Sequence, residues 1–203
     1  MTNSGKEESS NAIDLSRVLV LGSSCAGKTT FASELSTVIG APHIELDSLH
    51  WGPNWTARPH DELAAEVANV AATDRWIVDG CYFNLQPILW PRATTAIWLN
   101  YSFPVVAWQA VKRTLRRSLM RERLYGDNRE SLARALFSRE SILLWVATSY
   151  PHRRQDIPKQ LRRTEFNHLL PREFKHPRQA SRFLKLLAQP SALRGAKSRG
   201  LPS

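Results

Sequence analysis

Short apolar runs alternate with longer amphipathic segments along the chain, and this pattern predicts strands alternating with helices. Apolar runs typical of buried strands are Arg17–Leu21, His43–Asp47, Trp76–Gly80 and Ala96–Asn100, with a weaker run at Phe166–Leu170. Helical spacing is found at Thr29–Ile39, His60–Ala72, Pro104–Leu119, Arg134–Ser149, Arg153–Arg163 and His176–Leu187. We therefore expect an α/β fold with three layers, built on a five-stranded parallel sheet.

The two ends of the chain lack these patterns. We expect one domain at 16–188, a flexible leader at 1–15 and a disordered basic tail at 189–203, and a length of 203 residues suits a single α/β domain. The leader is polar rather than signal-like, and no apolar stretch approaches membrane-spanning length. Cys25 and Cys81 are too few for a disulfide framework. These features predict a cytoplasmic protein without a membrane partner.

The strongest motif follows the first predicted strand. Residues 22–30 read GSSCAGKTT and match G-x-x-x-x-G-K-T, which wraps backbone N–H groups around a nucleotide's phosphates. The alternative, a coincidental glycine-rich turn, is opposed by the strand before the motif and the helix after it. We expect Lys28 to reach the terminal phosphates and the Thr29 hydroxyl to bind Mg²⁺. The residues predicted to hold ATP are Gly22, Ser23, Ser24, Cys25, Ala26, Gly27, Lys28, Thr29 and Thr30.

Two acidic residues lie at the ends of predicted strands. Asp79, which ends the third strand, is expected to hold Mg²⁺ directly or through water, and the alternative is an ordinary Asp-Gly turn. Asp47, which ends the second, is a candidate to contact the metal's water, bind the acceptor or accept its proton. The alternative for Asp47 is a cap for the segment that begins at Ser48.

An aromatic, turn-rich segment follows Asp47 and is a candidate acceptor site, with His50, Trp51 and Arg58 as its proposed contacts. Trp51 and Trp55 suit either stacking on a base or sugar or packing under a lid. Arg58 suits a phosphate or carboxylate clamp. Three other tryptophans are expected in the core: Trp76, Trp98 and Trp145.

The net charge of +10 is concentrated in one part of the chain, because 112–163 holds 14 Lys and Arg against 5 Asp and Glu. We interpret about 112–135 as an arginine-rich lid over the transferring phosphoryl group, with Arg113, Arg117 and Arg121 as catalytic candidates. A solvated surface helix is one alternative. Another is a nucleic-acid-binding ATPase or regulator whose basic region contacts a phosphate backbone, although the basic cluster has no recognisable helix-turn-helix, zinc-finger or aromatic RNA-binding pattern.

Together, these segments resemble the adenylate-kinase-like P-loop proteins that are labelled DNA topology modulation proteins. The resemblance covers roughly 17–187 and is carried by Gly22–Thr30, His43–Trp51, Arg75–Tyr82 and the arginine-rich helix. The P-loop motif is shared by a whole superfamily. The patterns Leu-Asp-x-x-x-Trp and Trp-Ile-x-Asp-Gly-x-Tyr are more specific.

The resemblance implies a nucleoside- or nucleotide-kinase type of sheet, ATP and Mg²⁺ as ligands, and phosphoryl transfer to a small-molecule acceptor that it does not identify. Adenylate kinases have Phe-Pro-Arg where this chain has Cys81-Tyr82-Phe83, which argues against AMP as the acceptor. The lid lacks a four-cysteine zinc pattern, so the resemblance implies no metal beyond nucleotide-bound Mg²⁺. A non-catalytic, nucleotide-gated interaction protein is a further alternative.

Overall fold

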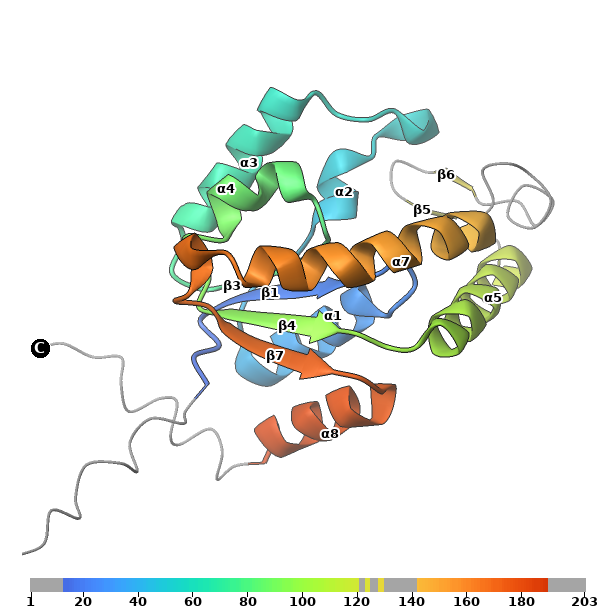
Figure 1. The fold of residues 1–203 in the computed structure, drawn as a ribbon. Helices are drawn as coiled ribbons and strands as arrows, with labels where there is room; N and C mark the ends of the chain where they lie inside the picture. Colours follow the sequence, from blue (N-terminus) through green and yellow to red (C-terminus); the bar gives the residue numbers. More distant parts are fainter. Residues whose placement is uncertain (1–12, 121–122, 125–127, 130–141, 190–203) are drawn as a thin grey trace, which may run out of the picture.

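A computed structural model describes residues 13–120, 123–124, 128–129 and 142–189 of the chain. Most of the predicted leader and tail and much of the predicted lid lie outside these residues. The centre is a parallel five-stranded sheet in the order β2-β3-β1-β4-β7, which confirms the predicted fold class (Figure 1). Its strands are β1 (Arg17–Gly22), β2 (His43–Glu45), β3 (Trp76–Asp79), β4 (Thr95–Leu99) and β7 (Leu170–Phe174).

Helices connect the strands and cover both faces of the sheet. They are α1 (Lys28–Ile39), α2 (Leu46–His50), α3 (His60–Ala72), α4 (Gln86–Leu89), α5 (Phe103–Met120), α7 (Ile142–Leu161) and α8 (Pro177–Leu187). Short 3₁₀ turns are η1 (Pro53–Trp55), η2 (Phe83–Leu85) and η4 (Thr164–Phe166). A small antiparallel pair joins β5 (Arg123–Leu124) to β6 (Asn128–Arg129). None of the described helices is both long and apolar enough to cross a membrane.

The central strand β1 is buried on both faces, which explains its continuous apolar run. Val18 and Val20 belong to the core that α1 and α8 complete, whereas Leu19 and Leu21 belong to the core under α3 and α4. All four residues are at most 2% exposed. Alternate side chains of a strand point to opposite faces, so this one run supplies both cores of the three-layer fold.

Helix α7 joins the two cores. Val146 and Tyr150, in its first half, pack in the core with α1, whereas Ile157, in its second half, packs in the core with α3. The Tyr150 hydroxyl donates a hydrogen bond to the Tyr101 carbonyl at 2.9 Å, just after β4. Helix α7 therefore passes close to the carboxyl ends of the strands, and it lies across the sheet in Figure 1.

The prediction of two separate helical segments, at Arg134–Ser149 and Arg153–Arg163, is wrong where the structure describes them. Helix α7 runs without interruption from Ile142 to Leu161, although Pro151 and Pro158 lie inside it. Proline removes one helical hydrogen bond and clashes with the preceding turn. Here the packing of Tyr150 and Ile157 on either side of Pro151 holds the helical path despite that cost.

The predicted position of the fifth strand is also wrong. Phe166 lies in η4 with its ring 5.1 Å from that of Trp90, and the strand begins only at Leu170. Four of the five residues in β7 are exposed. Because β7 is an edge strand with little buried surface, its sequence, LPREF, carries no alternation of apolar and polar residues that would locate it.

The core assignment of α8 can be tested by truncating two leucines of the same helix. Leu184 is 6% exposed and Leu186 is 49% exposed. We expect Leu184→Ala to lower the free energy of unfolding by about 2–4 kcal/mol, because it leaves a cavity. Leu186→Ala should cost under about 1 kcal/mol, since the position is largely solvated. Urea titration measures both, and equal losses would contradict this packing.

Candidate active site

The predicted nucleotide loop joins β1 to α1. Two of its glycines have backbone conformations that only glycine adopts easily. Gly22 has φ +153°, and a Cβ there would lie 3.0 Å from the Leu99 carbonyl oxygen. Gly27 has φ +83° and is the residue before the first turn of α1. The motif's two glycines therefore stand where the tight turn requires them.

The amino end of α1 faces this loop and is open to an anion. Its N-cap residue, Gly27, has no side chain that could cap the helix, and the first turn contains no acidic residue. The Lys28 Nζ donates to the Ser23 carbonyl at 3.1 Å, and the Ala26 N–H donates to the same oxygen at 3.2 Å. Uncapped N–H groups and the positive end of the helix dipole favour phosphate at this point.

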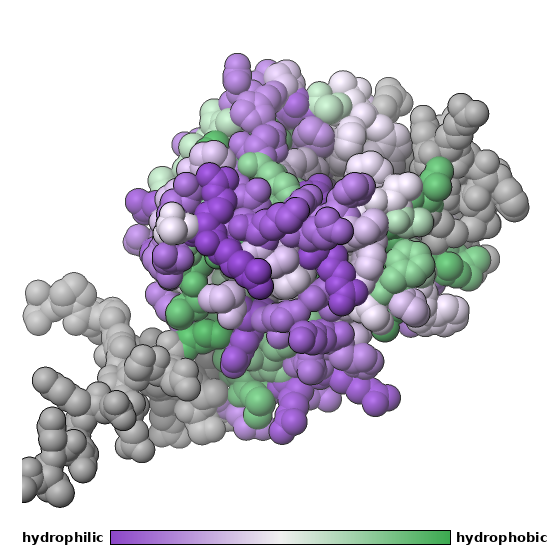
Figure 2. All heavy atoms as spheres, in the orientation of Figure 1, coloured by the Kyte–Doolittle hydropathy of each residue, from purple (hydrophilic) through white to green (hydrophobic). Residues whose placement is uncertain are grey.

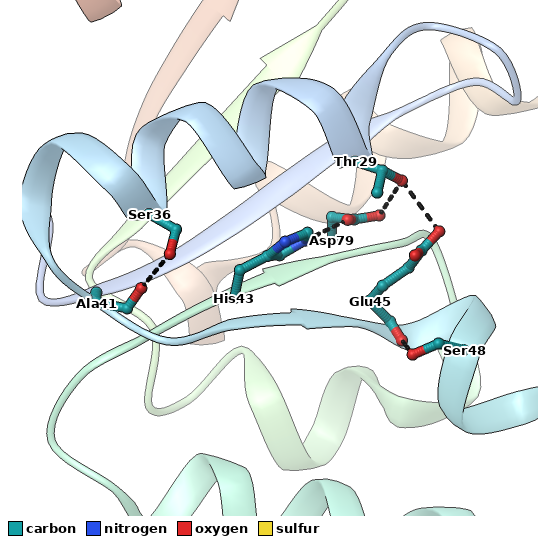
Figure 3. A network of polar contacts seen from close by, with 7 residues as sticks. All are labelled: Thr29, Ser36, Ala41, His43, Glu45, Ser48 and Asp79. Carbon is teal, nitrogen blue, oxygen red and sulfur yellow. Dashed lines mark hydrogen bonds and ion pairs between the residues drawn. The ribbon is translucent and has the colours of Figure 1, made fainter.

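Residues at the carboxyl ends of β2 and β3 meet at the Thr29 hydroxyl (Figure 3). Thr29 Oγ1 lies 3.1 Å from Glu45 Oε1 and 3.4 Å from Asp79 Oδ1. The strand register pairs Glu45 with Asp79, which places the two carboxylates side by side. A hydroxyl has one proton, so it donates to one carboxylate at a time, and the shorter contact is with Glu45.

This arrangement corrects the predicted place of Asp47. Strand β2 ends at Glu45, and Asp47 lies in the first turn of α2. Among the described residues, no hydrogen bond links Asp47 to Thr29 or Asp79. Glu45 takes that place, and it was missed because the apolar run was extended two residues too far. Its pairing with Asp79 is a property of the sheet.

Asp47 lies instead in an aromatic setting. The Tyr82 hydroxyl donates to Asp47 Oδ1 at 2.6 Å. The His50 ring lies 5.2 Å from the Tyr82 ring and 4.5 Å from the Trp51 ring, and Trp51 lies 6.0 Å from Trp55. The structure thus brings Asp47, His50 and Trp51 together, and their roles at an acceptor stay predictions.

Arg58 also lies on this segment but already has an anionic partner. Its Nη1 forms an ion pair with Glu66 Oε2 of α3, and both side chains are partly exposed. A partly exposed ion pair is weak and can exchange for a ligand. The role of Arg58 as a clamp stays a prediction.

Helix α7 adds two residues that were not expected at the site. The Trp145 Nε1–H donates to Ser24 Oγ of the nucleotide loop at 3.0 Å, and Trp145 is 54% exposed. Its predicted core position is therefore wrong, whereas Trp76 is fully buried as predicted. The Arg153 guanidinium lies 5.0 Å from the centroid of the Phe83 ring. No local motif marks Trp145 or Arg153, because only the packing of α7 brings them to the loop.

A small hollow lies between the nucleotide loop and α7. It is lined by Ser23, Asn100, Tyr101, Tyr150, Arg153 and Arg154, among others. Burial raises the pKa of Tyr101 to about 12. Arg153 and Arg154 bring positive charge to this side of the loop, whereas Glu45 and Asp79 lie on its other side.

Little of the predicted basic lid falls within the described side chains. Arg113 is half-buried on α5, Arg117 lies on α5 with its side chain outside the described ones, and Arg121 lies outside the described residues. Strand β6 lies beside η1, next to the candidate acceptor segment. Further along the basic region, α7 presents hydrophilic side chains to solvent (Figure 2). The catalytic roles of the three arginines stay predictions.

The oxygen donors near Thr29 fit Mg²⁺. A hydroxyl and two carboxylates, from Thr29, Glu45 and Asp79, are hard ligands of the kind that this ion prefers. In the described part of the chain, no group of three or more His, Cys, Asp and Glu residues is arranged to hold a metal by itself. Such a set suits an ion that arrives with a nucleotide, since Mg²⁺ takes one or two carboxylates and completes its shell with phosphate and water.

Comparison with known proteins finds similar folds only. A gluconokinase from Sinorhizobium meliloti is 15% identical, covers 89% of this chain and 97% of its own, and has a TM-score of 0.46. A shikimate kinase from Aquifex aeolicus is 14% identical, with 91% and 99% covered and a TM-score of 0.48. Shikimate kinase from Acinetobacter baumannii in complex with shikimate is 12% identical, with 92% and 97% covered and a TM-score of 0.49.

No protein-family model matches the chain, and no curated protein matches it either. Membership of the DNA topology modulation group therefore stays a prediction. At these identities and TM-scores, the similar structures carry no conclusion about what this chain binds or does. Its function has to be inferred from its own residues.

Replacing the first glycine of the loop tests its geometry. We expect Gly22→Ala to lower the free energy of unfolding by about 1–3 kcal/mol, because it combines backbone strain with a close contact. Gly52→Ala is the matched control, since Gly52 has no positive φ and its nearest atom would lie 3.5 Å away. Its effect should stay within about 0.5 kcal/mol. Thermal and urea unfolding provide the comparison, and an unchanged Gly22→Ala protein would contradict the loop geometry.

Proposed function

We propose that this protein is an ATP-dependent kinase that transfers the γ-phosphoryl group to a hydroxyl of a small-molecule acceptor. One observation carries the proposal. The Thr29 hydroxyl of the nucleotide loop meets the carboxylates of Glu45 and Asp79, while a third carboxylate, Asp47, lies apart among aromatic residues. The first group suits a metal–nucleotide complex, and the separate carboxylate suits an acceptor.

In this proposal, the backbone N–H groups from Ser23 to Thr29 hold the phosphates, and Lys28 exchanges its contact with the Ser23 carbonyl for the terminal phosphates. Thr29, Glu45 and Asp79 would hold Mg²⁺ directly or through water. When bound, the ion supplies positive charge to the β- and γ-phosphates. The uncapped amino end of α1 adds its dipole to the same site.

Asp47 is the proposed base. The acceptor oxygen attacks the γ-phosphorus, the bond from that phosphorus to the bridging oxygen breaks, and ADP leaves. The acceptor's proton passes to the Asp47 carboxylate and from there to solvent. Tyr82 donates to one oxygen of that carboxylate, which orients the other toward the acceptor. His50 and Trp51 would contact the body of the acceptor.

Helix α7 and the lid would act on the transferred group. The Arg153 guanidinium lies over the Phe83 ring and has no carboxylate partner among the described side chains. Arg153 also lines the hollow beside Ser23. We assign it, with Arg113, Arg117 and Arg121, to neutralising the charge of the transferring phosphoryl group. Trp145, which is hydrogen-bonded to Ser24, would exclude water from the loop.

On its motifs, we also propose that the chain belongs with the adenylate-kinase-like P-loop proteins and acts in the cytoplasm. Replacement of the Phe-Pro-Arg run by Cys81-Tyr82-Phe83 argues against AMP as the acceptor. The aromatic residues around Asp47 favour a hydroxylated molecule with a flat or apolar face.

Lys28→Ala tests the nucleotide site. We expect it to abolish ATP-dependent turnover and to weaken ATP binding by at least about tenfold, because a charge-assisted contact with phosphate is lost. Calorimetry measures the binding, and ADP release measures the turnover. Lys185→Ala is the control, since Lys185 is exposed on α8. Turnover by Lys28→Ala at the wild-type rate would overturn the assignment.

The acceptor can be sought by measuring ADP release with ATP, Mg²⁺ and a panel of nucleosides, nucleotides and hydroxylated metabolites. With the compound that stimulates release, Asp47→Asn should lower kcat by about 10²–10⁴-fold, because general-base catalysis is lost. The KM for ATP should stay within about threefold, since Asp47 does not contact the nucleotide in this scheme.

Tyr82→Phe serves as the graded control, because it keeps the base and removes only its hydrogen bond. Its kcat should fall by about tenfold, which corresponds to one hydrogen bond to a charged group. An Asp47→Asn enzyme with normal kcat would exclude Asp47 as the base.

A further inference from the structure

His43, which has no role in the proposed reaction, is hydrogen-bonded to Asp79, the buried aspartate of the proposed metal site. His43 Nε2 lies 2.7 Å from Asp79 Oδ2 (Figure 3). We infer that His43 is a positioning residue that fixes the Asp79 carboxylate and thereby sets the Mg²⁺-dependent part of nucleotide affinity. This inference rests on the proposed function, because it concerns the same nucleotide site.

The backbone explains why His43 can reach Asp79. His43 and Glu45 are two residues apart on β2, so both side chains project from the same face of the strand. That face carries the Thr29 contact. The chain on either side of the imidazole is held as well: Ser36 Oγ donates to the carbonyl of Ala41, two residues before β2, at 2.7 Å, and Ser48 Oγ donates to the carbonyl of Glu45, the last residue of β2, at 2.7 Å. The position of the His43 imidazole is therefore set by a strand whose flanking chain is held by hydrogen bonds at both ends.

The hydrogen bond has a defined direction. An ionised carboxylate carries no proton, so Nε2 carries one and donates it to Oδ2. The Asp79 side chain is 2% exposed and that of His43 is 16% exposed, so water has little access to the pair. A buried carboxylate oxygen without a donor is costly, which means that His43 gives Asp79 a strongly preferred orientation.

That orientation matters because the two Asp79 oxygens face different partners. With Oδ2 held by His43, Oδ1 is the oxygen that faces Thr29, at 3.4 Å. Glu45 approaches the same hydroxyl, so two carboxylates converge there. Without the imidazole N–H, the Asp79 carboxylate would turn away from Glu45 or toward another donor. Thr29 and Asp79 would then no longer present their oxygens together.

The consequence separates two parts of nucleotide binding. Contacts from the loop backbone and Lys28 to phosphate do not involve Asp79. Contacts from Asp79 are made to the metal or its water. A change at His43 should therefore reduce the gain in ATP affinity that Mg²⁺ provides, and leave metal-free ATP binding close to normal.

Two amide variants of different length test this inference. The Gln side-chain nitrogen can stand where Nε2 does, whereas the Asn nitrogen is too short to reach Oδ2. Calorimetry would measure the binding of a non-hydrolysable ATP analogue to wild type, His43→Gln and His43→Asn, each with Mg²⁺ and with EDTA. We expect His43→Asn to lose about tenfold to a hundredfold in the affinity measured with Mg²⁺, the range for a hydrogen bond to a charged group.

His43→Gln should stay within about threefold of wild type, since it restores the donor. Both variants should bind the analogue in EDTA as wild type does, which also shows that they are folded. Equal Mg²⁺ dependence in His43→Asn and wild type would overturn the inference, and so would an equal loss in both variants. If wild type itself gains nothing from Mg²⁺ or does not bind the analogue, the proposed function fails instead.

Discussion

The meeting of three chain segments at the Thr29 hydroxyl is the constraint on which the rest of the site depends. The hydroxyl lies 3.1 Å from the Glu45 carboxylate and 3.4 Å from that of Asp79. Parallel strands place their carboxyl ends at one edge, so β2 and β3 deliver these acids to the loop that follows β1. Two carboxylates that share one hydroxyl repel each other, and that hydroxyl, the His43 N–H and the dipole of α1 offset the repulsion.

Helix α7 makes a second contribution from far along the chain. Its prolines would favour a break, yet Tyr150 and Ile157 hold it in both cores, and the helix passes the nucleotide loop. This path brings the indole of Trp145 to Ser24 and the guanidinium of Arg153 to Phe83. Acidic groups thus lie on one side of the loop and basic groups on the other. In the proposed reaction, the acidic groups would hold the metal ion, and the basic groups would neutralise the charge of the transferring phosphoryl group.

Sequence-based expectations succeeded where a local pattern has one physical cause. The run Arg17–Leu21 is apolar because both faces of β1 are buried, and the bounds of α3 match its apolar spacing. The expectations failed where a strand was only partly buried, or where the contacts of a residue came from a distant part of the sequence. Strand β7 is an exposed edge, and Asp47 was placed on a strand that ends two residues earlier. The Tyr82 contact to Asp47 joins residues 35 apart, so no spacing rule predicts it.

The sequence alone located the glycine-rich loop between β1 and α1, because its two glycines, Lys28 and Thr29 fall within nine residues whose geometry is local. It also determined the alternation of strands and helices, since hydrophobic periodicity is a local property. Only the tertiary structure decided which acids share Thr29, that His43 holds Asp79, and that α7 reaches the loop. Strand order and register set those contacts. Both arise from packing over the whole sheet, which no short segment encodes.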